Sequence, residues 1–242
     1  MYSQEYQLVW SEEFNSSEIN PEIWNFEKGF SKNNEQQFYT SRPQNARIEN
    51  GKLILEARKE KYGEEADYTS ARLNTLGKKD FRYGKIEVRA KLPKGAGTWP
   101  AIWMLGSNEP EVGFPACGEI DIMEFIGKSS DEIYGSVHYP ENEDDNLISA
   151  TREAKLPATN DGYHTFSVEW DGAHISYFVG DRKFFTFSVD DANRSGRKNP
   201  FRKPFYLILN LALGGKWAGE IEDTHLPACF YVDYVRYYQL KN

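Results

Sequence analysis

The sequence predicts an all-β fold, a sandwich of two antiparallel sheets. About a dozen segments of the chain have the composition of β-strands, and almost none repeat with the period of an α-helix. Aromatic residues make up 15% of the 242 residues, which suits half-buried pleated surfaces. The length suits one sizeable domain, and no linker, repeat or low-complexity tract divides it. We therefore expect residues 1–242 to form a single domain.

Strand signals run through the first half of the chain. They cover residues 6–14, 47–55, 70–76, 83–92, 98–105 and 119–126. The segment 47–55 is typical of a hairpin, because Asn50-Gly51 favours the backbone of a tight turn. Residues 70–76 and 83–92 alternate polar and apolar side chains, whereas 98–105 and 119–126 are more continuously apolar.

The second half continues the same pattern. The expected strands are residues 134–138, 163–170, 173–179, 183–188, 204–213 and 230–239. Asp171-Gly172 and Gly180-Asp181 supply turns between neighbouring strands. Residues 20–24 and 190–195 are candidates for short helices. The polar stretches 59–67 and 141–153 predict loops with solvated charges.

The charge balance narrows the choice of partner. The net charge is −8 and the pI is about 5.2. This argues against nucleic acid or an anionic membrane, because both bind basic surfaces, while a neutral polymer stays compatible. No apolar stretch has the length of a membrane helix. The start of the chain is polar and shows no signal peptide, so the protein is either intracellular or trimmed.

Cysteine is rare in this chain. Cys117 and Cys229 could form one disulfide bond at most, or they could be two small buried hydrophobic residues, and both alternatives stay open. Neither is a good candidate for a nucleophile, since no His lies nearby in the sequence.

The run GEIDIMEFI at residues 118–126 carries the strongest functional signal. Glu119 and Asp121 share one face of a strand because side chains alternate. Strict alternation would turn Glu124 into the core, where an unpaired carboxylate is costly. One extra residue at Ile122-Met123, a β-bulge, returns Glu124 to the acidic face. We therefore predict a bulge there and a trio of carboxylates, a common arrangement for cleaving glycosidic bonds.

The expected distance between Glu119 and Glu124 limits their interpretation as a catalytic pair. Glu119 and Glu124 are expected about 13 Å apart at their Cα atoms, from four strand steps at the usual rise. The carboxyl groups of a retaining glycosidase lie about 5–5.5 Å apart. The two side chains meet only if the strand is bent and they lean together.

Aromatic residues near the acidic run are candidates for a sugar-binding surface. Trp99 and Trp103 are four residues apart and share a strand face, and Trp217 lies among glycines in a loop. Binding grooves combine aromatic walls with a few polar groups, and sugars stack on aromatic rings. Core packing is the alternative, and for an isolated Trp it is the better one.

Three polar candidates have weaker support. Asn34 belongs to an amide-rich cluster that could hydrogen-bond sugar hydroxyls or form an exposed loop. Arg72 lies on a strand and serves either the groove or nearby surface acids. His138 ends a short strand, and a lone His is more often structural than catalytic. No His-rich or Cys-rich spacing predicts a catalytic zinc.

Several segments of the sequence resemble those of a known family. The segment GEIDIME at 118–124 resembles the active-site signature of glycoside hydrolase family 16 in its six-residue, bulged form. The flanking segments resemble the laminarinases, the family's endo-β-1,3-glucanases, nearly end to end. These segments are WSEEFN at 10–15, GTWPAIWML at 97–105, GGKWAG at 214–219 and YVDYVR at 231–236.

The resemblance implies a β-jelly roll of two curved antiparallel sheets, with a substrate cleft on the concave face. Such curvature would bring the two glutamates together. By position, Glu119 resembles the nucleophile, Glu124 the acid/base, and Asp121 the residue that hydrogen-bonds the nucleophile. Three clustered carboxylates cannot all ionise cheaply, so we expect a raised pKa, with the proton on Glu124.

The resemblance also implies binding residues outside the acidic run. The positions matching sugar subsites are Asn34, Arg72, Trp99, Trp103, His138 and Trp217. A structural Ca²⁺ is implied on the opposite face, with the backbone carbonyls of Glu13 and Gly51 and the side chain of Asp233 as ligands. The expected catalysis needs no cofactor. The resemblance also favours a secreted protein whose signal peptide has been trimmed.

We therefore expect a monomeric, retaining endo-β-1,3-glucanase that acts on β-glucan polysaccharides, with mixed β-1,3/1,4-glucans left open. One alternative is another activity of this family, on agarose, carrageenan or xyloglucan. A second is a non-catalytic carbohydrate-binding jelly roll. A third is a structural metal site of Glu119, Asp121 and Glu124, which the apolar residues between them disfavour.

Overall fold

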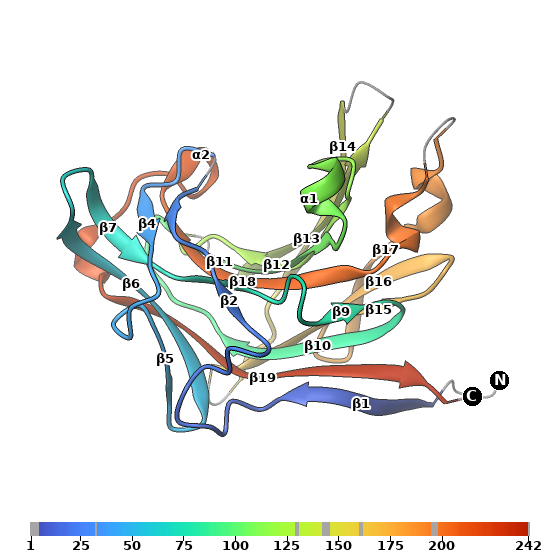
Figure 1. Cartoon of the computed structure of the whole chain (residues 1–242), viewed down its shortest axis with the longest axis horizontal. Coiled ribbons are helices and arrows are strands. Elements are labelled where there is room, and N and C mark those ends of the chain that lie inside the picture. Colours follow the sequence, from blue (N-terminus) through green and yellow to red (C-terminus); the bar gives the residue numbers. More distant parts are fainter. Residues whose placement is uncertain are drawn as a thin grey trace.

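The two-sheet sandwich is confirmed. The computed structural model describes residues 5–31, 33–128, 131–141, 146–159, 162–194 and 198–241. Within these residues the chain forms one sheet of eleven strands and one of eight. Figure 1 shows both sheets curving the same way, with α2 and β4 rising at one end of the concave side and α1 and β14 at the other. The smaller sheet lines this concave side.

The larger sheet is antiparallel except where β4 pairs with β7. Its order is β17-β16-β15-β10-β19-β6-β7-β4-β3, and β1 and β5 add to β19 and β6. Its strands are β1 (Tyr6–Glu12), β3 (Gly29–Phe30), β4 (Gln37–Tyr39), β5 (Ala46–Glu49), β6 (Lys52–Tyr62), β7 (Ala66–Ser70), β10 (Gly84–Lys91), β15 (His164–Trp170), β16 (His174–Val179), β17 (Arg182–Ser188) and β19 (Ala228–Leu240).

The smaller sheet has the order β14-β13-β12-β11-β18-β8-β2, and β9 also pairs with β18. Its strands are β2 (Asn25–Phe26), β8 (Arg72–Asn74), β9 (Asp80–Phe81), β11 (Thr98–Gly106), β12 (Glu119–Phe125), β13 (Glu132–Pro140), β14 (Leu147–Lys155) and β18 (Phe205–Leu213). The helical segments are short: α1 (Glu109–Val112), α2 (Gly215–Ala218), and the 3₁₀ turns η1 (Val189–Ala192), η2 (Pro200–Arg202) and η3 (Asp223–His225).

The core lies between the two sheets. Ile86 and Val88 of β10 face it from the larger sheet, and Ile102 and Met104 of β11 face it from the smaller one. β18 is buried along its whole length. Apolar side chains on one face of each strand therefore hold the sheets together, and the other face of the smaller sheet is left for function.

Several local predictions need correction. The stretch 59–67 is a hairpin, because β6 continues to Tyr62 and β7 starts at Ala66. Most of the stretch 141–153 belongs to the exposed edge strand β14, and residues 142–145 lie outside the described part. Charged side chains suit an edge strand with a solvated face, and this composition mimics a loop. Residues 21–23 form a turn, and 190–195 contains only part of η1, with Ser195 outside the described residues.

The cysteines are free thiols, which excludes the disulfide alternative. Cys117 packs in a small cluster with Leu105, Tyr206 and Ile208 under the concave face. Burial raises the pKa of the Cys117 thiol to about 12, so it is a poor nucleophile. In the described part of the chain, every helix is too short or too polar to cross a bilayer.

Candidate active site

The predicted bulge in β12 is present. Against β11, Asp121 pairs with Trp103 and Met123 with Ile102, and Ile122 is the extra residue between them. The register against β13 breaks at the same place. Ile122 and Met123 are both fully buried. The bulge therefore places two successive apolar side chains in the core and resets the alternation for the residue that follows.

Glu124 is turned to the concave face, as predicted. Its Oε1 accepts a hydrogen bond from Nε1 of Trp99 at 3.1 Å. Trp99 belongs to β11 and is only partly buried, as is Glu124 itself. The acid therefore lies beside an aromatic wall instead of inside the hydrophobic core.

Cross-strand pairing brings His138 to the acidic run. Glu119 of β12 lies opposite His138 of β13. The ring Nε2 of His138 is 3.1 Å from Asp121 Oδ2 and 3.8 Å from Glu119 Oε1. Its Nδ1 is hydrogen-bonded to Oγ of Ser149 on β14 at 2.7 Å. The histidine, predicted only as a subsite residue, thus lies against two of the three predicted catalytic acids.

Burial raises the pKa of all three carboxyl groups. For Glu119 and Glu124, burial and the neighbouring negative charges raise the pKa well above its usual range, while His138 opposes the shift. For Asp121, burial raises the pKa to about 8, and a hydrogen bond with Glu119 opposes it. The cluster therefore holds protons near neutral pH, as a general acid requires.

The predicted spacing along the strand is also found. Glu119 lies opposite Leu105 and Glu124 opposite Ala101, four residues apart on β11. This corresponds to about 13 Å between Cα atoms at the usual rise. The negative charge of Glu119 is nevertheless one of the causes that raise the pKa of Glu124.

Three aromatic rings form a wall beside Glu124. Trp217 of α2 packs edge-on against Trp99 at 5.2 Å and against Tyr134 of β13 at 5.0 Å between ring centroids. Trp217 remains 37% exposed. An exposed ring fixed by two others offers a rigid apolar platform for a sugar ring.

Trp103 and Arg72 form a second polar and aromatic group on the same face. Nε1 of Trp103 donates a hydrogen bond to Oδ1 of Asn210 at 2.7 Å. The guanidinium of Arg72 lies 4.6 Å from the centre of the Trp103 ring and pairs with Glu27 at 3.0 Å. Arg72 thus serves both alternatives that the sequence left open, since it faces the concave side and balances an acid.

Asn34 lies further out, in a turn. It is exposed and has a left-handed φ of 58°. The next residue, Glu35, forms an isolated bridge with Gly214, just before α2. The turn therefore borders the Trp217 loop, and the role of Asn34 in binding stays a prediction.

Comparison with known proteins decides the family. The model of glycosyl hydrolases family 16 matches residues 33–236. The chain belongs to glycoside hydrolase family 16. A β-glucanase of Rhodothermus marinus is 41% identical over 97% of this chain and 85% of its own length. The catalytic domain of an endo-1,3-β-glucanase (laminarinase) from Thermotoga petrophila is 44% identical, with a TM-score of 0.88 over 99% of this chain and 100% of that domain.

Two other relatives have names that denote different substrates. A glucan endo-1,3-β-glucosidase A1 of Niallia circulans is 34% identical over 96% of this chain, which spans 38% of that protein. A keratan-sulfate endo-1,4-β-galactosidase of Sphingobacterium multivorum is 35% identical over 98% of this chain, which spans 56% of it. The chain is a glycoside hydrolase of the laminarinase branch, and the family's hydrolysis needs no catalytic cofactor.

Two site residues were missed by the sequence reasoning. Tyr134 lies four residues before His138 on one strand, so period-two alternation already places both on one face. Asn210 is the single polar residue of β18, and a polar residue inside an apolar run signals a specific buried hydrogen bond. Both signals are present in the sequence, but the sequence does not show which residues Tyr134 and Asn210 contact.

The side chain predicted to bind calcium is already paired with cations. Asp233 Oδ1 contacts Nζ of Lys52 at 2.7 Å, and Oδ2 contacts Arg89. Burial raises the pKa of Asp233, but these two cations more than offset it and hold the pKa below its usual value. Calcium takes six to eight oxygen ligands, and here it would have to displace Lys52. Calcium binding by Glu13, Gly51 and Asp233 therefore stays a prediction, and at Asp233 it requires displacement of the Lys52 ammonium.

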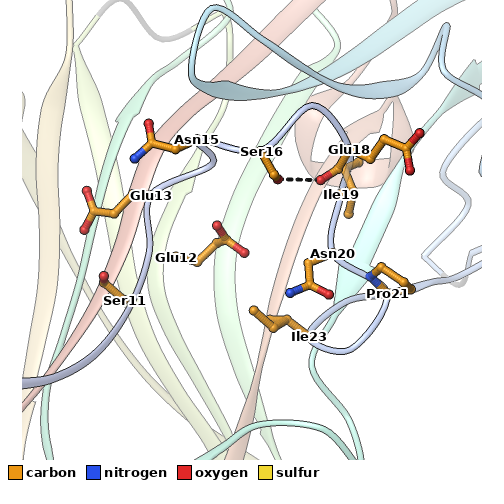
Figure 2. Close-up of a pocket in the computed structure, with 10 residues that line it drawn as sticks. All are labelled: Ser11, Glu12, Glu13, Asn15, Ser16, Glu18, Ile19, Asn20, Pro21 and Ile23. Atoms are coloured by element: carbon orange, nitrogen blue, oxygen red, sulfur yellow. Dashed lines mark hydrogen bonds between the residues drawn. The ribbon is translucent and has the colours of Figure 1, made fainter.

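Glu13, one of the residues predicted to bind calcium, lines a hollow of the surface. It follows the chain after β1, has a volume of about 460 Å³ and is lined by Glu12, Glu13 and Glu18 among others (Figure 2). Glu12 accepts a hydrogen bond from the backbone N–H of Phe14, and Ser16 donates one to the carbonyl of Glu18. These polar groups stabilise the loop itself, and none of the predicted catalytic residues lines the hollow.

Proposed function

We propose that this chain is a retaining endo-β-1,3-glucanase that cleaves laminarin-type β-glucans and tolerates mixed β-1,3/1,4-glucans. Its relatives in the laminarinase branch support the substrate class. The β-bulge at Ile122 is the observation that supports the proposed mechanism. It places Glu124 on the face that already holds Glu119 and Asp121.

The first step forms a glycosyl-enzyme ester. Glu119 attacks the anomeric carbon as a carboxylate, the form that the charge of the neighbouring His138 favours against the effect of burial, and the bond from that carbon to the glycosidic oxygen breaks. Glu124 gives its proton to the departing oxygen. The raised pKa of Glu124 keeps that proton in place near neutral pH.

The second step restores the enzyme. Glu124, now a carboxylate, takes a proton from a water molecule, and the water oxygen attacks the anomeric carbon. The ester bond to Glu119 breaks, and the product keeps its original anomeric configuration. Asp121, which hydrogen-bonds Glu119, and His138, 3.8 Å from it, orient the Glu119 carboxylate in both steps.

The aromatic wall and the Trp103–Arg72 pair bind the sugar chain on this face. Trp217 supplies an exposed ring, and Arg72 supplies hydrogen-bond donors beside Trp103. Asn34 would add hydrogen bonds at the rim. We also propose that the enzyme acts as a secreted monomer, without nucleic-acid or membrane partners. The negative net charge supports the exclusion of anionic partners.

A galactan-directed activity is the second candidate, because one relative is named a keratan-sulfate endo-1,4-β-galactosidase. Sulfated substrates favour basic residues in the groove, whereas this site is dominated by three acids, with Arg72 as its basic group. A purely binding role is disfavoured, because a lectin gains nothing from three clustered carboxyls with raised pKa values.

The experiment compares laminarin, lichenan, agarose and xyloglucan as substrates, with reducing ends as the readout and product sizes as the test of endo action. We expect laminarin to be cleaved fastest, lichenan next, and the galactan little. The variant Glu119→Ser should lose hydrolysis and keep oligosaccharide binding, measured by calorimetry. Faster cleavage of agarose than of laminarin would overturn the substrate assignment, and normal hydrolysis by Glu119→Ser would overturn the nucleophile.

A further inference from the structure

His138, Asp121 and Glu119 have roles in the proposed hydrolysis, and their ligand atoms also lie close enough together to suggest a metal site. Nε2 of His138 lies 3.1 Å from Asp121 Oδ2 and 3.8 Å from Glu119 Oε1, and the three atoms lie within 4.8 Å of one another. Zinc-type ions form bonds of about 2.0–2.2 Å to imidazole and carboxylate, so ligand atoms about 3–4 Å apart can share one ion. The two distances from His138 suit a shared ion, and the three side chains are close enough to hold one after small movements.

The buried oxygen of Asp121 gives independent support. The Asp121 side chain is 4% exposed, and its Oδ2 points at the His138 ring without making a hydrogen bond. A buried carboxylate oxygen without a hydrogen bond is costly, and coordination of a cation would satisfy it. Glu119 is more open, with 18% of its side chain exposed, which leaves a direction for water or another ligand.

The imidazole is also held as a metal ligand would be. Its Nδ1 is hydrogen-bonded to Oγ of Ser149 at 2.7 Å. Metal-binding histidines almost always make a hydrogen bond through the second ring nitrogen, and such a bond fixes the orientation of the ring. Ser149 lies on β14, two strands from the acids, so the arrangement spans three neighbouring strands.

We propose that Glu119, Asp121 and His138 form an inhibitory site for a divalent transition-metal ion of the zinc class. One imidazole nitrogen and two carboxylate oxygens leave a fourth tetrahedral position for water. Calcium and magnesium are poor occupants, because they prefer all-oxygen sites with more ligands. The ion would coordinate Glu119 and so block the attack on the sugar. That last consequence rests on the proposed function, whereas binding of the metal does not.

Cobalt(II) is the probe that tests binding without any substrate. We expect the wild-type protein to take up one equivalent of Co²⁺ with the intense visible absorption of a tetrahedral site, and Zn²⁺ to displace it. His138→Gln should lose the absorption. Ser149→Ala should keep it but bind about 10- to 100-fold more weakly. His225→Gln is the matched control, since His225 also lies near a carboxylate, 3.7 Å from Glu222, but is remote from the acidic run in the sequence and belongs to η3.

The outcomes separate cleanly. Loss of the cobalt spectrum in His138→Gln with retention in His225→Gln supports the site. An unchanged spectrum in His138→Gln, or no tetrahedral cobalt in the wild type, overturns it. In hydrolysis assays, Zn²⁺ should inhibit laminarin cleavage and Ca²⁺ should not. If the protein proves to have no glucanase activity, the proposed function fails, while the cobalt spectrum still decides the metal site.

Discussion

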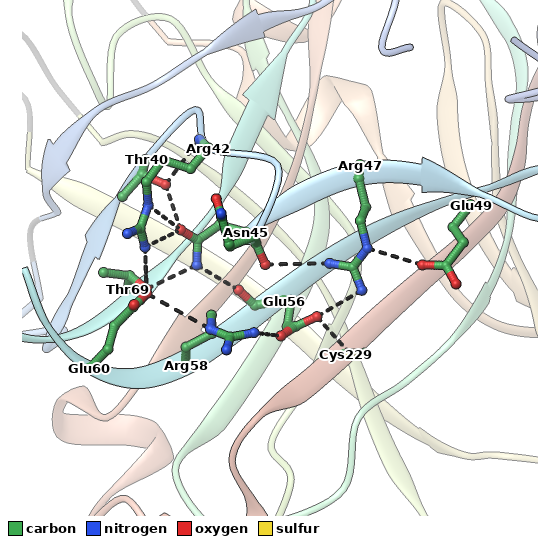
Figure 3. Close-up of polar contacts among 11 residues, drawn as sticks. Thr40, Arg42, Asn45, Arg47, Glu49, Glu56, Arg58, Glu60, Thr69 and Cys229 are labelled. Carbon is green, nitrogen blue, oxygen red and sulfur yellow. Dashed lines mark hydrogen bonds and ion pairs between the residues drawn. The ribbon is translucent and has the colours of Figure 1, made fainter. Parts of the chain in front are cut away.

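Two groups of buried carboxylates in this molecule have opposite surroundings. Asp121, in the acidic cluster of Glu119, Asp121 and Glu124, is 4% exposed at its side chain, and Glu56 on β6 is 7% exposed. Around Asp121 the neighbours are two more acids and a histidine. Around Glu56 they are two arginines, in the network drawn in Figure 3. Burial is nearly equal, and the neighbouring charges differ.

The network of Figure 3 neutralises its acids. Glu56 pairs with Arg47 at 2.9 Å and with Arg58, and Glu60 pairs with Arg42. Burial raises the pKa of Glu60, but Thr69 and the arginines outweigh it and hold the pKa below its usual value. Glu60 is therefore ionised when the protein is folded near neutral pH, and its charge favours the fold.

In the acidic cluster of Glu119, Asp121 and Glu124, ionisation has the opposite effect on stability. Burial and mutual repulsion raise the pKa values of its carboxyls, so their ionisation opposes folding. The comparison teaches that a buried acid supports stability when cations surround it and supplies proton chemistry when they do not. Each prediction below substitutes an isosteric amide or changes conditions, to test whether the two regions really respond in opposite ways.

The largest effect is expected for Glu124→Gln. The amide cannot donate the proton to the leaving oxygen, so kcat on laminarin should fall by about 100- to 10,000-fold. The folded protein should be no less stable, because a charge that opposed folding is gone. Steady-state kinetics and thermal unfolding measure the two effects. Glu60→Gln is the control and should keep its activity but unfold at a lower temperature. Glu124→Gln with more than a tenth of wild-type activity would contradict the role.

Glu56→Gln should mainly reduce stability. It leaves Arg47 and Arg58 without a buried negative partner, which costs about 1.5–3 kcal/mol in the free energy of unfolding. Urea denaturation measures this, and activity should stay normal. The matched control is Glu49→Gln, which also pairs with Arg47 but is 54% exposed. Its effect should be within about 1 kcal/mol. Equal losses in both variants would show that burial of the pair is unimportant.

The pH dependence of stability should differ in sign between the regions. The folded pKa of Asp121 is raised from 3.8 to about 8, so its stabilising protonation is complete below about pH 4 and lost as pH rises toward 8. Asp121→Asn should therefore gain stability relative to the wild type over that interval. Glu60 has a lowered folded pKa, so Glu60→Gln should be the weaker protein above about pH 4.3, with the gap closing in acid.

Urea denaturation of the three proteins between about pH 2 and pH 8 tests this contrast, because the Glu60 difference closes only below about pH 4.3. Parallel curves for Asp121→Asn and the wild type would mean that Asp121 titrates normally in the folded protein. If the stability of Glu60→Gln and of the wild type varied with pH in parallel, Glu60 would also titrate normally in the folded protein.

The smallest effect is expected for calcium. Asp233 resembles the network acids, because Lys52 and Arg89 already neutralise it. Addition of Ca²⁺ or removal of metals with EDTA should leave the thermal unfolding temperature unchanged. A rise of several degrees with Ca²⁺ would show that calcium displaces Lys52 and would restore the ligand set expected from the family.

The sequence by itself determined the two-sheet class, most strand positions and the bulge in β12. These are local properties, since alternation of side chains and the cost of burying Glu124 act within one strand. The prediction of a loop at 141–153 was wrong, because an edge strand such as β14 and a loop have similar compositions.

Tertiary structure alone decided which distant side chains meet. Strand pairing set His138 against the acids, Ser149 against His138 and Asn210 within hydrogen-bond distance of Trp103. Packing of α2 brought Trp217 to Tyr134. Register between strands depends on the whole sheet, so no local pattern contains these contacts. The same holds for charge. Whether a buried carboxylate meets arginines, as Glu56 does, or other acids is settled only when strands far apart in the sequence are side by side.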